Sequence, residues 1–169
     1  MRGRKIMIYQ NEKIRRKKAL ISAKKVFSQF SNLELIEFEN PDSEWIKLFD
    51  TALKQFRNID SNPTFHIPIG DVKSKYILWI ESSLGSLSFS NHKTEYFILV
   101  PNCLEPVWAN VRILNFTKSI EELWDISETN EFIIADKSTG QIAQIFSEEE
   151  CYEIHFKRCN TDLIDSLKN

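Results

Sequence analysis

Alternating apolar and polar residues predict a β-hairpin over residues 131–146. Two β-rich runs, EFIIAD and QIAQIF, flank the turn-prone KSTG, where Gly140 is available for a positive φ. Two further β-rich runs, at 95–101 and 106–114, can pair with this hairpin. Together these runs predict an antiparallel sheet.

Two other segments have strand character. Residues 33–39 alternate in period two, with Leu33 and Leu35 on one side. Residues 65–70 contain Pro68, which cannot donate to a ladder, so this run is expected to be at most an edge strand.

Helical spacing of apolar residues, together with helix-start signals, predicts several helices. Most are amphipathic, and the segment at 71–85 can also be read as a strand through YILWI. The last long segment is expected to be helical, with a strand through EIHFKR as the alternative. The predicted helices cover residues 12–30, 40–58, 71–85, 117–128, 147–159 and 161–169.

Four sets of residues suggest where these helices begin and end. Asn40 is predicted as an N-cap followed by proline at the first helical position, and Asp71 with Gly85 is expected to bound the next helix. Two capping boxes are predicted, formed by the pairs Ser119 with Glu122 and Ser147 with Glu150.

The length of 169 residues suits one domain that buries a core of its own. The sequence therefore predicts a single α+β domain over residues 1–169, with residues 1–11 expected as a flexible extension. Its mostly antiparallel sheet is expected to have four to six strands, with helices packed on one face.

The charge of the chain is distributed unevenly. The net charge is −2, but residues 1–30 carry ten Lys or Arg against one acid, whereas the remainder is acidic at −11. The RRKK cluster at 15–18 is consistent with nucleic-acid binding, but a solvated helix face explains it better, and the acidic remainder would repel phosphates. No apolar run approaches the ~20 residues of a membrane span. Nucleic acid and membrane are therefore not the expected partners.

The spacing of Cys151, His155 and Cys159 resembles a set of metal ligands. On a helix the outer two would lie ~12 Å apart along the axis, too far to share one ion. We therefore predict no metal site, and no phosphate-binding glycine motif indicates a cofactor. With three cysteines, the third being Cys103, reduced thiols in a cytoplasmic protein are expected.

Clustered carboxylates are the remaining candidates for function. General acid–base chemistry needs carboxylates in a cleft, and these are predicted at helix starts and exposed positions instead. They can present a negative surface to a basic partner. The predicted partner-binding residues are Glu121, Glu122, Asp125, Glu128, Glu148, Glu149 and Glu150.

The order of segments resembles that of small bacterial immunity proteins of polymorphic-toxin and contact-dependent inhibition systems. The resemblance covers residues 40–150 through WIKLFDTALKQF, EYFILVP, PVW, IEELWD and EFIIADKSTGQIAQIFSEE. It implies a non-catalytic protein that binds and neutralises a cognate toxin domain. Two alternatives stay open: a small enzyme using Cys/His or carboxylate chemistry, and a nucleic-acid-associated regulator using the basic N-terminal helix.

Overall fold

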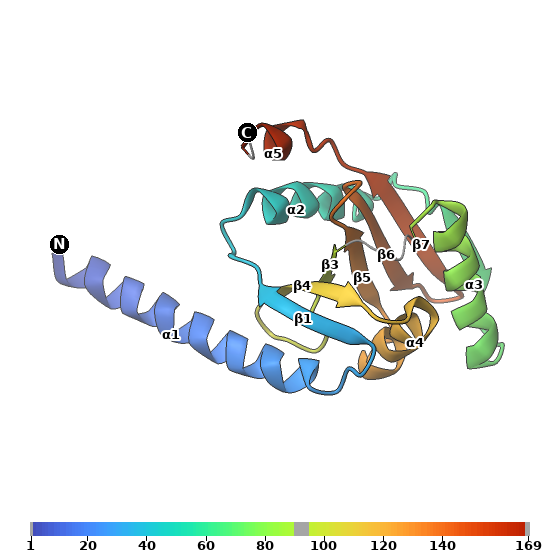
Figure 1. Ribbon diagram of the computed structural model, residues 1–169, viewed down its shortest axis with the longest axis horizontal. Coiled ribbons are helices and arrows are strands. Elements are labelled where there is room, and N and C mark those ends of the chain that lie inside the picture. Colours follow the sequence, from blue (N-terminus) through green and yellow to red (C-terminus); the bar gives the residue numbers. More distant parts are fainter. Residues whose placement is uncertain (1, 90–94, 168–169) are drawn as a thin grey trace.

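The computed structural model describes residues 2–89 and 95–167, in which helices cover both faces of one sheet (Figure 1). The seven strands pair antiparallel in the order β1-β4-β3-β5-β6-β7-β2. The strands are β1 (Leu33–Phe38), β2 (Phe65–Pro68), β3 (Glu95–Leu99), β4 (Trp108–Ile113), β5 (Phe132–Asp136), β6 (Gln141–Ser147) and β7 (Cys151–Arg158). The helices are α1 (Arg2–Phe27), α2 (Glu44–Phe56), α3 (Lys73–Ser86), α4 (Phe116–Ile126) and α5 (Asp162–Leu167).

The α+β class and the antiparallel sheet are confirmed, but the helices lie on both faces of the sheet rather than on one. Tyr96 and Ile98 belong to a core shared with α1, α3 and α4. Phe97, the residue between them, belongs to a second core with α2 and Ile164 of α5. The central strands are apolar at consecutive positions, so each face needs its own cover.

The predicted hairpin is confirmed as β5 and β6, paired from Phe132 opposite Ile145 to Asp136 opposite Gln141. Gly140 ends the turn with a φ of 71°. A Cβ there would lie 2.5 Å from Thr161 Cγ2 and 3.0 Å from Cys159 O, so glycine is needed both for its conformation and for the close approach of the chain after β7.

The strand predictions at 33–39 and 65–70 are also confirmed, as β1 and β2, which form the two edges of the sheet. Pro68 is the last residue of β2, at the outer edge, where no ladder hydrogen bond from its nitrogen is required.

The prediction of a helix over 147–159 is wrong, and its capping box from Ser147 and Glu150 does not form. Residues 148–150 make the turn between β6 and β7, and β7 pairs with β6 on one side and β2 on the other. Tyr152, Ile154 and Phe156 all join the first core, which is the period of two that a strand requires.

Three predicted helix starts are displaced. The N-cap of α2 is Ser43, whose Oγ accepts from the Ile46 N–H at 3.2 Å, whereas Asn40 Oδ1 accepts from Asp42 N–H in a turn before the helix. Asn115 rather than Ser119 caps α4, with its Oδ1 accepting from Lys118 N–H at 3.0 Å.

The third displaced start is that of α3, which begins after Val72 rather than after Asp71 and has no side-chain cap. Asp71 instead accepts from Val72 N–H and forms an ion pair with Lys75. Gly85, the expected end, lies inside the helix.

Helix α1 begins earlier than predicted, so residues 2–11, expected as an extension, are part of it. Only its C-terminal part packs on the sheet, through Ala19, Ala23, Val26 and Phe27. The N-terminal part projects away from the remainder of the molecule (Figure 1). At 1.5 Å per residue the helix is about 39 Å long. Within the described residues, no helix combines the length and apolarity that a membrane crossing requires.

Candidate partner-binding site

The predicted acidic residues divide into two places. In α4, Glu121 and Asp125 both contact the ammonium of Lys73 at the start of α3, at 3.0 and 2.7 Å. All three side chains are about half exposed. These contacts connect α3 to α4 at the surface, so two of the predicted partner-binding carboxylates already have a basic neighbour.

Glu122 has a structural role. Its carboxylate accepts hydrogen bonds from the backbone N–H groups of Ser31 and Asn32 at 2.9 and 3.0 Å, and from the side-chain amide of Asn32 at 3.0 Å. Three donors around one carboxylate fix the connection between α1 and β1 against α4. Glu122 therefore stabilises the fold itself, and its position is explained without binding to a partner protein.

The remaining predicted acids gather at one end of the sheet. The Ser147 N–H donates to Glu131 Oε1 at 3.0 Å, which brings the turn at 148–150 beside the loop after α4. The Trp124 and Tyr152 rings lie 4.8 Å apart at the same end. Within the described residues, no ion pair involves the exposed carboxylates Glu128, Glu148, Glu149 and Glu150. We call these four residues the acidic end.

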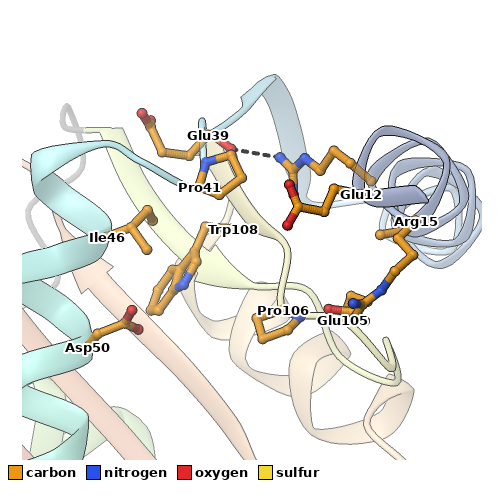
Figure 2. A pocket seen from close by; sticks show the side chains of 11 residues that line it. Glu12, Arg15, Glu39, Pro41, Ile46, Asp50, Glu105, Pro106 and Trp108 are labelled. Carbon is orange, nitrogen blue, oxygen red and sulfur yellow. Dashed lines mark hydrogen bonds and ion pairs between the residues drawn. The ribbon is translucent and has the colours of Figure 1, made fainter. Parts of the chain in front are cut away.

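A groove between α1 and α2, which the sequence did not predict, is the more developed feature. Figure 2 shows Glu12 and Arg15 reaching it from α1, and Ile46 and Asp50 from α2, with Trp108 between them. Its volume is about 380 Å³. The full lining is Glu12, Arg15, Arg16, Ala19, Glu39, Pro41, Ile46, Asp50, Glu105, Pro106 and Trp108.

Both arginines of the groove are engaged by the protein itself. Arg16 donates to the Glu39 carbonyl at 2.9 Å, as the dashed line in Figure 2 shows, and Arg15 forms an ion pair with Glu105. The Glu105 carboxylate raises the pKa of Arg15, whereas partial burial lowers the pKa of Arg16. These contacts join the middle of α1 to the rim of the groove.

The lower part of the groove is apolar. Trp108 is only 4% exposed, and its ring packs against Phe49 at a centroid distance of 5.3 Å. Ile46 is also buried, and Pro41 and Pro106 complete the apolar wall. A concave site with an apolar floor and a charged rim is suited to holding a side chain of a partner.

The N-terminal part of α1 forms the outer edge of this region. Ile6, Met7, Ile8, Tyr9 and Ile14 are each between 50% and 68% exposed. All four basic residues of the RRKK cluster belong to this helix, and of these only Arg15 and Arg16 line the groove. We refer to residues 5–14 as the α1 arm.

The cysteines and histidine singled out by their spacing do not assemble. They lie along β7 or just after it, so Cys151 and His155 are about 13 Å apart at 3.3 Å per residue. The buried His155 has its own neighbours, with Nε2 2.9 Å from Glu153 Oε2 and Nδ1 3.4 Å from Ser61 Oγ. Over residues 2–89 and 95–167, no group of three potential ligands is placed to hold a metal ion.

The thiols are also poorly suited to nucleophilic chemistry. Burial raises the pKa of Cys103 and that of Cys159, and burial together with Glu153 raises the pKa of Cys151. The thiolate, which is the reactive form, is therefore scarcer at neutral pH than in an ordinary cysteine.

The groove was missed because it depends on residues from three distant segments of the chain, 12–19, 39–50 and 105–108. One signal was available in the sequence: residues 1–30 contain ten basic residues and a single acid, Glu12, which lines the groove.

Comparison with protein-family models, with curated proteins and with solved structures finds no match in any of the three.

Proposed function

We propose that this chain is a non-catalytic binding protein of the bacterial cytoplasm, an immunity protein that binds and neutralises a cognate toxin domain. The observation that carries this proposal is the α1 arm. Five large apolar side chains lie exposed on a helix that projects from the domain (Figure 1). These side chains surround one short stretch of helix, and such a concentration of exposed apolar residues is typical of a protein-binding segment.

The groove beside the arm supports the same proposal. The α1 arm adjoins the apolar floor and the charged rim of the groove, because Glu12 and Arg15 of α1 line the groove. An apolar centre with a polar rim is the usual composition of a protein–protein interface. Binding here requires no turnover, and the raised pKa values of the cysteines count against the alternative of Cys/His catalysis.

The direct test is protection from a toxin. The chain is co-expressed in bacteria with the toxin domain encoded beside its gene, and growth and complex formation are measured. We expect restored growth and a stable complex. Failure of the intact chain to bind or protect against that domain would overturn the proposal.

A pair of variants locates the binding surface. Ile8→Asp combined with Tyr9→Asp places two charges on the arm, and Ile59→Asp places one on a still more exposed apolar residue elsewhere. Because both positions are exposed, the fold should be retained. We expect the arm variant to weaken the complex at least tenfold, which is about 1.4 kcal/mol, and the Ile59 variant to bind as the parent protein does.

A second candidate, nucleic-acid binding, is favoured by one observation. The basic residues at the start of α1 lie on the part of the helix that projects away from the acidic domain, so for them the repulsion expected from the sequence acts over a greater distance. A helix of this kind has the dimensions of the DNA major groove. Replacing residues 15–18 by glutamine should abolish salt-sensitive retention on duplex DNA if this candidate is correct.

A further inference from the structure

We propose that the α1–α2 groove receives a basic side chain, arginine foremost, from the surface of the protein partner. This inference takes from the proposed function that the partner is a protein, and it adds which kind of side chain the groove binds. Three features of the groove support it: an excess of carboxylates over arginines, a buried indole with a free donor, and an apolar wall of suitable size.

The charge of the groove favours a cation. Its lining includes four carboxylates and two arginines. Both arginines are occupied, Arg16 by a backbone carbonyl and Arg15 by Glu105. The other three carboxylates, Glu12, Glu39 and Asp50, have no ion pair with any described residue. Glu12 on α1 and Asp50 on α2 stand on two sides of the concavity, with Trp108 between them (Figure 2), so a guanidinium between them gains more than one acceptor.

Trp108 supplies an independent reason to expect a ligand. Trp108 is only 4% exposed, and it lines the groove. Among the described residues the indole N–H of Trp108 has no acceptor, and its nitrogen is not fully enclosed by protein atoms. Because Trp108 lines the groove, we take the N–H to face the open space of the groove. Buried tryptophan N–H groups usually have an acceptor. A main-chain carbonyl beside the incoming side chain is the acceptor that a peptide would provide.

The dimensions and walls of the groove fit this occupant. A space of about 380 Å³ accommodates one long side chain with adjoining main-chain atoms. Pro41, Ile46 and Pro106 offer apolar contact to the methylene stem, while the charged head reaches the carboxylates at the rim. Arginine is preferred over lysine because its planar fork of donors binds carboxylates in pairs.

The probe is the peptide acetyl-Gly-Arg-Gly-amide, with the neutral isostere acetyl-Gly-citrulline-Gly-amide as the matched ligand. The full chain is labelled with ¹⁵N, and the assigned indole signal of Trp108 is followed during titration. We expect the arginine peptide to shift this signal and the citrulline peptide to bind at least tenfold more weakly. Equal shifts with both peptides, or no shift of Trp108 with either, would overturn the inference.

Matched variants test the residues. Glu12→Gln with Asp50→Asn removes two carboxylates from the groove and should weaken the arginine peptide roughly tenfold. Glu37→Gln with Asp60→Asn makes the same change of net charge at exposed positions outside the groove and should leave the affinity unchanged. If both double variants lose affinity equally, the effect is one of overall charge and the inference fails.

The two proposals fail in different experiments. If the Glu12/Asp50 variant still binds and neutralises the toxin as the parent does, the groove inference is wrong while the proposed function stands. If the intact chain gives no protection but the arginine peptide binds at Trp108, the proposed function is wrong and the groove remains a site for basic side chains.

Discussion

Glu122 holds Asn32 by two hydrogen bonds of 3.0 Å, one from the backbone N–H and one from the side-chain amide. A third, of 2.9 Å, comes from the neighbouring N–H of Ser31. This carboxylate therefore connects α4 to the segment that joins the packed end of α1 to β1.

Glu122→Ala should destabilise the protein by about 1–3 kcal/mol, because partly buried donors lose their acceptor. Glu121→Ala is the matched control one residue away, where an exposed ion pair with Lys73 is worth at most about 1 kcal/mol. Urea unfolding of both variants measures the difference. Equal losses of unfolding free energy would show that the contact with residues 31 and 32 adds nothing.

The two glycines Gly140 and Gly85 should respond oppositely to alanine. At Gly140 the positive φ and the close approach of Thr161 and Cys159 make Gly140→Ala destabilising, by at least about 1–2 kcal/mol. At Gly85, inside α3 with no atom within 4 Å of an added Cβ, Gly85→Ala should stabilise by up to about 1 kcal/mol. Thermal unfolding of the pair provides the measurement, and a change of the same sign in both would contradict the account.

Glu95 should make stability depend on pH in the acid range. Hydrogen bonds from Lys137 and Asn110 lower the pKa of its carboxyl in the folded protein. The unfolded chain then binds the proton more readily, so this contribution is complete above the ordinary pKa of 4.5 and is lost as pH falls through the lower folded value.

Glu95→Gln should therefore flatten the loss of unfolding free energy between neutral and acid pH, and Lys137→Met, which removes the largest cause of the shift, should flatten it similarly. Urea unfolding at a series of pH values measures the slopes. A Glu95→Gln protein that keeps the slope of the parent would exclude this role.

The three cysteines should react slowly in the folded protein. Each has a pKa above its ordinary value, and Cys159 is also only 6% exposed. At neutral pH we expect Cys159 to be alkylated by iodoacetamide at least about tenfold more slowly than in denaturant. Mass spectrometry of tryptic peptides follows each thiol separately, and a cysteine that reacts faster in the folded state would instead be an activated nucleophile.

The sheet could be predicted to the extent that its strands carry local signals. Gly140 indicated the hairpin turn and Pro68 indicated the edge strand, and both are in place. The β7 strand was mistaken for a helix because Ser147 and Glu150 imitate a capping box. The alternation of Tyr152, Ile154 and Phe156 indicated a strand, and pairing with β6 and β2 stabilises the strand over the helix.

The site was less predictable than the fold. The sequence identified clustered acids, but Glu122 is used within the domain, and the acidic end comes together through the pairing of β5 with β6 and the contact between Ser147 and Glu131. The groove joins Glu12, Asp50 and Trp108 from segments almost a hundred residues apart. No local pattern encodes such a juxtaposition, because it follows from which sheet face each helix covers.

The projection of α1 gives the molecule a large electric dipole. Residues 1–30 carry a charge of +9 and the remaining residues −11, and the N-terminal part of α1 carries a part of the positive charge beyond the sheet. At physiological salt such a field reaches about 8 Å into solution, far enough to turn the molecule before it touches a charged partner. Its association rate with such a partner should fall steeply with salt, while the dissociation rate, set by the apolar contacts, should change little.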